Sequence, residues 1–197
     1  MNKNIFSLII GFILSINLVS AHGDFGAGGI LSGLTHPLLG ADHLVAMIIV
    51  GMLSVLFQLS RKTSIFEAPI IFVVALVTGA IISMDIGLGF SPELLVSLSV
   101  VLLGIMMFFN IYDKEWIVYT GYIFIYFFGF MHGAAHGNEL PVSSKPILYI
   151  IGFMFTSIML HISGIFISKF AYKYKYGNII IKTISILSII FGCYLIF

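Results

Sequence analysis

Charged residues are scarce in this chain of 197 residues: only 9% are Asp, Glu, Lys or Arg, against about 25% in a soluble domain. The single cysteine, Cys193, excludes an intramolecular disulfide and a thiolate metal cluster within one chain. A net charge of +1 provides no basic surface for nucleic acid. No P-loop sequence is present, which excludes ATP hydrolysis by that motif.

Apolar residues are abundant instead. They make up 60% of the chain, and the mean hydropathy is +1.15. Runs of the length that crosses a lipid bilayer occur at roughly 28–58, 66–85, 92–111, 115–136, 146–168 and 178–197. The pattern predicts an all-α membrane protein, a bundle of six transmembrane helices that forms one domain over residues 22–197.

The N-terminal segment MNKNIFSLIIGFILSINLVSA differs from these runs. It has one lysine, a short apolar stretch, and small residues at Val19 and Ala21. This pattern is typical of a cleavable signal peptide, so residues 1–21 are predicted to be removed and the mature chain to begin at His22. The alternative is an uncleaved first transmembrane helix.

The basic residues predict the orientation. Cytoplasmic loops of membrane proteins are enriched in Lys and Arg. If the mature chain begins outside, only Lys145 falls on the outer side. The residues that then lie on or near the cytoplasmic side are Arg61, Lys62, Lys114, Lys169, Lys173, Lys175 and Lys182. We therefore expect a protein of the bacterial inner membrane with both mature termini periplasmic or exterior.

Polar residues in a membrane span are costly and often mark a functional site. The segment HPLLGADHLVAM places His36, Asp42 and His43 in the first span. His36 and His43 share a helix face, but they are about 10 Å apart along a straight axis, too far to chelate one ion together. Either the two histidines serve two sites, or a break at Pro37, which removes a backbone hydrogen bond, shortens that distance.

The fourth span carries a second group, in the segment MHGAAHGNELP. His132 and His136 are four residues apart, a spacing that lets two imidazoles address one metal ion, and Glu139 follows one turn later. Imidazole and carboxylate donors suit divalent nickel, cobalt, zinc, copper or iron better than Cu(I). Close helix approach is permitted by Gly129, Gly133 and Gly137.

Three further residues are weaker candidates. Glu93 begins a predicted helix, where a carboxylate is also favoured as an N-terminal charge. His161 lies within the fifth span and has the alternative of a hydrogen-bonded core residue. His22 would offer an α-amine and an imidazole at the outer mouth after signal removal, with a disordered terminus as the alternative.

Four segments in register resemble the successive signatures of the HupE/UreJ family of hydrogenase and urease accessory membrane proteins. They are HPLLGADHLVAMIIVG, PELLVSLSVVLLG, FGFMHGAAHGNELP and GFMFTSIMLHISG, and the likeness runs from about His22 to Gly164. The resemblance implies a secondary nickel permease. The residues to which it points are His36, Asp42, His43, Glu93, His132, His136, Glu139 and His161.

Two functions remain open at this stage. The first is a permease that collects a divalent cation at the outer mouth and holds it between the first and fourth spans, which invite an inverted repeat of three helices. The second is a membrane metalloprotein, an enzyme or a metal-delivery protein, that keeps one or two ions permanently near the periplasmic side. The scarcity of polar residues in the inner half beyond His161 counts against transport.

Overall fold

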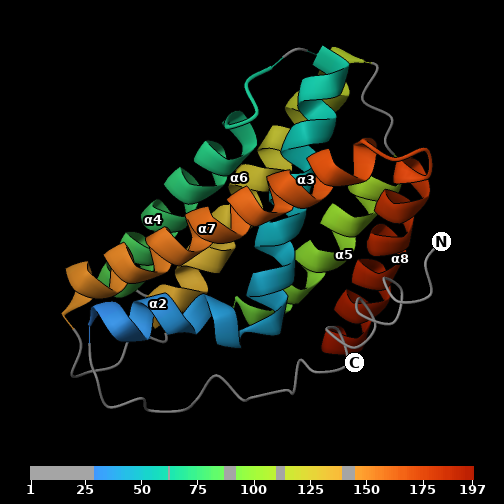
Figure 1. Ribbon diagram of the computed structural model, residues 1–197. Coiled ribbons are helices and arrows are strands. Elements are labelled where there is room, and N and C mark those ends of the chain that lie inside the picture. Colours follow the sequence, from blue (N-terminus) through green and yellow to red (C-terminus); the bar gives the residue numbers. More distant parts are fainter. Residues whose placement is uncertain (1–28, 62, 87–91, 110–113, 139–144) are drawn as a thin grey trace.

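The computed structural model describes residues 29–61, 63–86, 92–109, 114–138 and 145–197 (Figure 1). These residues form seven helices and no strand, as the predicted all-α class requires. In chain order the helices are α2 (Ile30–Leu39), α3 (Ala41–Arg61), α4 (Glu67–Ile86), α5 (Glu93–Phe109), α6 (Glu115–Asn138), α7 (Pro146–Tyr172) and α8 (Gly177–Ile196). The predicted signal peptide, residues 1–21, lies outside the described residues.

Five of these helices, α3, α4, α6, α7 and α8, are long and apolar enough to cross a bilayer. The chain is therefore a multi-pass membrane protein. The predicted third span, 92–111, corresponds to α5, which has 17 residues and a length of about 26 Å. Large apolar side chains such as Leu59, Ile123 and Phe166 lie on the outer surface, whereas four histidines and several serines are buried. That distribution suits a bundle surrounded by lipid.

The first predicted span is two helices, and its break lies at Gly40 and not at Pro37. Pro37 is accommodated inside α2, which continues to Leu39 and closes with a hydrogen bond from the Gly40 N–H to the His36 carbonyl, 3.1 Å. Gly40 is extended, with φ −78° and ψ 102°. α3 begins at the next residue, and its first turn carries Asp42, where a carboxylate is favoured.

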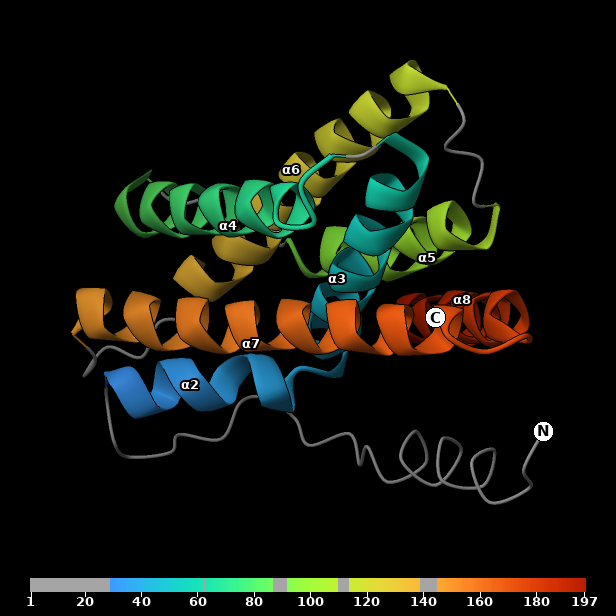
Figure 2. The same ribbon diagram turned by 45° about the horizontal axis from the view of Figure 1, so that its top comes forward.

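The helices pack in pairs (Figures 1 and 2). α2 and α3 both pack along α7, α4 packs on α6, and α5 packs on α8. If the chain is divided into the halves α3–α5 and α6–α8, α3 corresponds to α6, α4 to α7 and α5 to α8. The α3–α7 pair then corresponds to the α6–α4 pair, and the α5–α8 pair corresponds to itself. The pairing thus fits the inverted three-helix repeat that the two histidine-bearing spans suggested.

Glycines allow the closest of these approaches. A Cβ added at Gly133 of α6 would lie 1.8 Å from the carbonyl oxygen of Leu76 on α4. Gly129 and Gly137, one turn away on either side, face the same helix, with α4 carbonyl oxygens 2.8 and 2.6 Å from an added Cβ. This confirms the close approach expected from their spacing, and it fixes the end of α6 that carries the second histidine group against α4.

Candidate metal site

Four imidazole rings lie together where α2, α3 and α6 meet. The ring centroid of His43, on α3, is 4.5 Å from that of His136 and 5.0 Å from that of His132, both on α6. The His36 ring, on α2, is 4.8 Å from His136 and 6.2 Å from His43. The two predicted groups therefore form a single histidine cluster (His36, His43, His132 and His136).

The break at Gly40 brings His36 and His43 together. Along one straight helix the two residues would be about 10 Å apart, but their ring centroids are 6.2 Å apart because α3 leaves α2 at an angle. A Cβ at Gly40 would lie 3.0 Å from His43 Nδ1 and 3.3 Å from Asp42 Oδ1. Glycine at this position thus leaves room for the two side chains that follow it.

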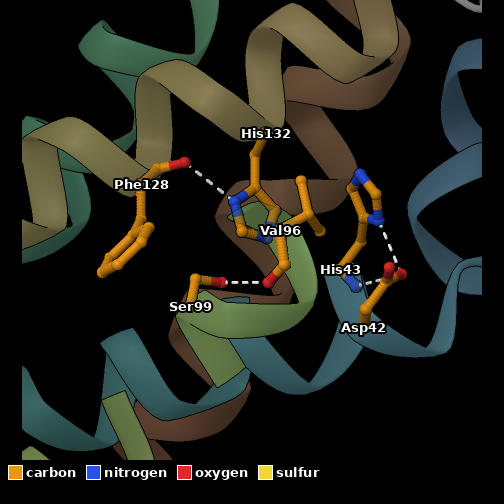
Figure 3. Close-up of polar contacts among 6 residues, drawn as sticks. All are labelled: Asp42, His43, Val96, Ser99, Phe128 and His132. Carbon is orange, nitrogen blue, oxygen red and sulfur yellow. Dashed lines mark hydrogen bonds and ion pairs between the residues drawn. The ribbon is translucent and has the colours of Figure 1, made fainter. Parts of the chain in front are cut away.

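Asp42 orients His43 (Figure 3). Its Oδ1 accepts hydrogen bonds from both the backbone N–H and the ring Nδ1 of His43, each 2.8 Å long. A carboxylate only accepts, so Nδ1 carries the hydrogen and the lone pair is on Nε2. Carboxylates that hold metal-ligating histidines in this way fix both the ring orientation and the tautomer.

The His132 ring is held by its own helix. Its Nδ1 donates to the carbonyl of Phe128, one turn earlier, over 2.8 Å. Its Nε2 is buried without a hydrogen-bond partner in the described part of the chain. Figure 3 shows the ring extending from α6 toward the start of α5, where Ser99 donates to the carbonyl of Val96 over 2.5 Å. The hydrogen bond at Nδ1 thus fixes the His132 ring and leaves the lone pair of Nε2 available to a metal ion.

His136 is the most unusual member of the cluster. It is completely buried, and neither ring nitrogen has a hydrogen-bond partner among the described residues. Its ring stacks on Phe153 of α7, with centroids 4.8 Å apart. An unsatisfied buried polar atom costs about 1–3 kcal/mol, and in native proteins such atoms call for a bound water or ion. His136 therefore has the features of a ligand residue.

His161 lies outside the cluster. It is buried in α7, and its Nδ1 donates to the Ser157 carbonyl over 2.5 Å. Its Nε2 has no hydrogen-bond partner among the residues described. The ring of Phe72, on α4, contacts both histidine rings, with centroids 5.3 Å from His132 and 5.1 Å from His161.

The remaining predicted residues lie elsewhere. Glu93 is the first residue of α5, with an exposed side chain one turn before Val96. His22 and Glu139, which were expected at the outer mouth, lie outside the described residues. No prediction about them is tested by the fold.

The cluster as it stands is packed ring against ring. Over the ranges that the structure describes, no group of three or more His, Cys, Asp or Glu side chains is arranged to hold a metal ion. The rings of His43 and His132 meet nearly edge to face, at 75°. Imidazole ligates a divalent ion through nitrogen at about 2.1 Å, so binding here requires the rings to rotate toward a common point.

Three aromatic residues around these histidines escaped prediction. Phe153 stacks on His136, Tyr149 lies 6.0 Å from His36 between ring centroids, and Phe72 contacts two histidines. The four-residue spacing of Tyr149 and Phe153 on α7 is a signal for a shared face. Phe72 has no such signal, because it lies in a uniformly apolar run.

Comparison with known proteins is consistent with the motifs. Residues 10–195 match the family model described as HupE / UreJ protein. A curated relative, Protein HupE of Rhizobium leguminosarum bv. viciae, is 28% identical over 167 residues, which cover 84% of this chain and 83% of the relative. No solved structure matches the chain.

Proposed function

Since the chain belongs to the HupE/UreJ family, we propose that it is a secondary transporter, or permease, for a divalent transition-metal cation, with nickel as the first candidate. The observation that carries the proposal is His136. A fully buried imidazole with both nitrogens lacking partners in the described structure lies within 5 Å of two other imidazoles, measured between ring centroids. A cation bound between the rings would stabilise such a residue, because it would give a buried nitrogen the partner that it lacks.

The ring spacing supports a shared ion. Two imidazoles on one tetrahedral ion, each at about 2.1 Å, have ring centroids about 5 Å apart. The pairs that His136 forms with His43 and His36 have separations of 4.5 and 4.8 Å. These two separations are compatible with a shared ion once the rings rotate to aim their nitrogens at it. His43, held by Asp42, and His132 complete the proposed donor set.

The donor chemistry supports a divalent ion. Neutral imidazole with carboxylate suits nickel, cobalt, zinc, copper and iron in the divalent state, and the cluster contains no thiolate. Nickel is first because the family resemblance implies it. Glu93, His161, and the outer residues His22 and Glu139 belong to the proposed path of the ion.

The direction of transport follows from the proposed orientation. The cluster lies at the start of α3 and the end of α6, opposite the end that carries Arg61 and Lys114. With the basic end cytoplasmic, the cluster faces the periplasm of the inner membrane. The membrane potential then favours the inward movement of each unit of charge by about 2.3 kcal/mol per 100 mV.

Flux into vesicles tests this function. The full-length protein is reconstituted into liposomes that contain a nickel-sensitive dye, and Ni²⁺ is added outside with an inside-negative potential. We expect saturable Ni²⁺ influx that is absent from protein-free liposomes and from the His136→Phe variant. Competition by Co²⁺, Zn²⁺, Cu²⁺ and Fe²⁺ then identifies the preferred ion.

Metal analysis of the same preparation separates the two candidate functions. Tightly bound metal that does not exchange, together with no influx, would overturn the transporter and favour a metalloprotein. Normal influx by His136→Phe would overturn the assigned site and leave the transporter standing.

A further inference from the structure

Two buried histidines that make the same hydrogen bond within their own helices both contact one aromatic ring, that of Phe72. In both His132 and His161, Nδ1 donates to the carbonyl four residues earlier, and the buried Nε2 has no partner in the helices described. The fully buried Phe72 ring contacts both, with centroids 5.3 and 5.1 Å away. One buried apolar ring therefore contacts both a histidine of the cluster and a histidine outside it.

A further polar group follows His161 on α7. Ser168, seven residues later, lies on the same helix face. It is completely buried, and its hydroxyl has no hydrogen-bond partner within the described ranges. From His161 to Ser168 the helix runs away from the histidine cluster, toward the end that carries Lys169. Buried polar atoms without a hydrogen-bond partner among the described residues thus continue along α7 from His161 to Ser168, away from the histidine cluster.

Phe72 and its two neighbours belong to different helix pairs. Phe72 and His132 lie on the α4–α6 pair, which is so close at Gly129 that a Cβ there would be 2.8 Å from the Phe72 carbonyl oxygen. His161 lies on the α3–α7 pair, where a Cβ at Gly51 would be 2.1 Å from the His161 carbonyl oxygen. Contacts between the two pairs are less extensive than those within them.

The difference in packing has a mechanical consequence. Closely packed helices move together, and sliding occurs between the less tightly packed groups. A displacement of the α4–α6 pair against the α3–α7 pair changes the contact between Phe72 and His161. It leaves the contact between Phe72 and His132 unchanged, because both residues lie on the pair that moves.

We propose that Phe72 is the constriction between the histidine cluster and an inner metal-binding position at His161, and that it closes the path of the ion between them. The proposal rests on the transport function proposed above. An apolar ring supplies no ligand to a cation and excludes water, so it blocks passage as long as it fills the gap. Sliding of the two helix pairs opens the gap and exposes the His161 Nε2 to the ion.

Two substitutions of opposite size test the constriction. Phe72→Leu removes part of the ring and Phe72→Trp enlarges it, and Ni²⁺ binding in detergent and Ni²⁺ influx into liposomes are measured on each full-length variant. We expect influx to rise about tenfold in Phe72→Leu and to fall about tenfold in Phe72→Trp, with each factor of ten being 1.4 kcal/mol of barrier. The dissociation constant for Ni²⁺ should stay within about twofold of wild type, because the cluster supplies the ligands.

A matched variant controls for a general packing defect. Phe57 of α3 is also completely buried, and its ring packs on Tyr122, away from the histidines. Phe57→Leu should leave influx unchanged. Wild-type influx in both Phe72 variants, a slower Phe72→Leu, or binding that weakens in parallel with influx would each overturn the constriction. If the wild-type protein carries no Ni²⁺, the transport function itself fails, and the constriction fails with it.

Discussion

The two ends of the helix bundle differ in how their ionisable side chains are paired. At the end where α3 stops and α4 and α6 begin, Arg61 forms an ion pair with Glu115, with 2.5 Å between nitrogen and oxygen. Nearby, the Tyr122 hydroxyl donates to Glu67 over 2.8 Å, and the second oxygen of Glu67 accepts from the backbone N–H of Ser64. These ionisable side chains are paired, although the buried hydroxyls of Thr63 and Ser168 at this end have no hydrogen-bond partner among the described residues.

At the other end the pairing is incomplete. His132 has one buried nitrogen and His136 has two that meet no partner among the described residues, in an interior where such atoms destabilise the fold. The first end connects three helices, and its polar contacts are explained by structure alone. The second end is costly without a ligand, so we assign binding to it. Four predictions test this difference between the two ends.

The largest effect is expected at His136. His136→Phe keeps an aromatic ring of similar shape on Phe153 and removes two buried polar atoms. Replacing an unsatisfied buried group by an apolar one is neutral or stabilising, so thermal unfolding should occur at the same or a higher temperature. Ni²⁺ affinity should fall about a hundredfold, or roughly 2.7 kcal/mol. A calorimetric titration measures the Ni²⁺ affinity, and a melting curve in the same detergent measures the stability. A variant that unfolds at a lower temperature and still binds Ni²⁺ normally would show that His136 has a structural role and no binding role.

The second effect concerns orientation. Asp42→Asn replaces the carboxylate that accepts from His43 Nδ1 by an amide, which can present its NH₂ group and no longer dictates the tautomer. Loss of such an orienting partner weakens metal binding by about 10–100-fold. Asp85→Asn, an exposed aspartate at the end of α4, is the matched control and should bind normally. Equal affinity in the two variants would show that Asp42 has no orienting role.

The third effect concerns the close contact between α4 and α6. Gly133→Ala puts a methyl group where the Leu76 carbonyl oxygen is 1.8 Å away, so α4 and α6 must separate. We expect a loss of about 2 kcal/mol in stability, with weaker Ni²⁺ binding as a consequence. At Gly104 the nearest atom to a new methyl is the Ile189 side chain, 3.0 Å away, so Gly104→Ala should cost less. A fully stable Gly133→Ala protein would contradict the close contact.

Much of this arrangement could be predicted from the sequence, for identifiable reasons. Long apolar runs predict helices because hydrocarbon requires internally satisfied backbone hydrogen bonds. Five of the six predicted runs contain a helix long and apolar enough to cross a bilayer, namely α3, α4, α6, α7 and α8. Buried histidines stand out in such runs, so the residues of both groups could be named. The four motifs also identified the family correctly.

Other features depend on tertiary contacts that no local pattern encodes. The break was expected at Pro37 because proline lacks an N–H, yet a helix tolerates that loss and ends where Gly40 makes room for Asp42 and His43. Phe72 is indistinguishable in sequence from any lipid-facing phenylalanine. Its contact with both His132 and His161 results from the packing of α4 against α6 and α7, which only the three-dimensional structure reveals.

The smallest effect on Ni²⁺ binding is expected at the end of the bundle that carries Arg61, Glu67 and Tyr122. Tyr122→Phe removes the hydrogen bond to Glu67, for which we expect a loss of about 1 kcal/mol in stability. Ni²⁺ affinity should not change, because the bond lies at the end of the bundle opposite the histidine cluster. His136→Phe and Tyr122→Phe would then separate the two properties: one variant binds Ni²⁺ more weakly and keeps its stability, and the other binds Ni²⁺ normally and is less stable. If Tyr122→Phe weakens Ni²⁺ binding as well, the polar contacts at this end control the site, and the division between a structural end and a binding end is wrong.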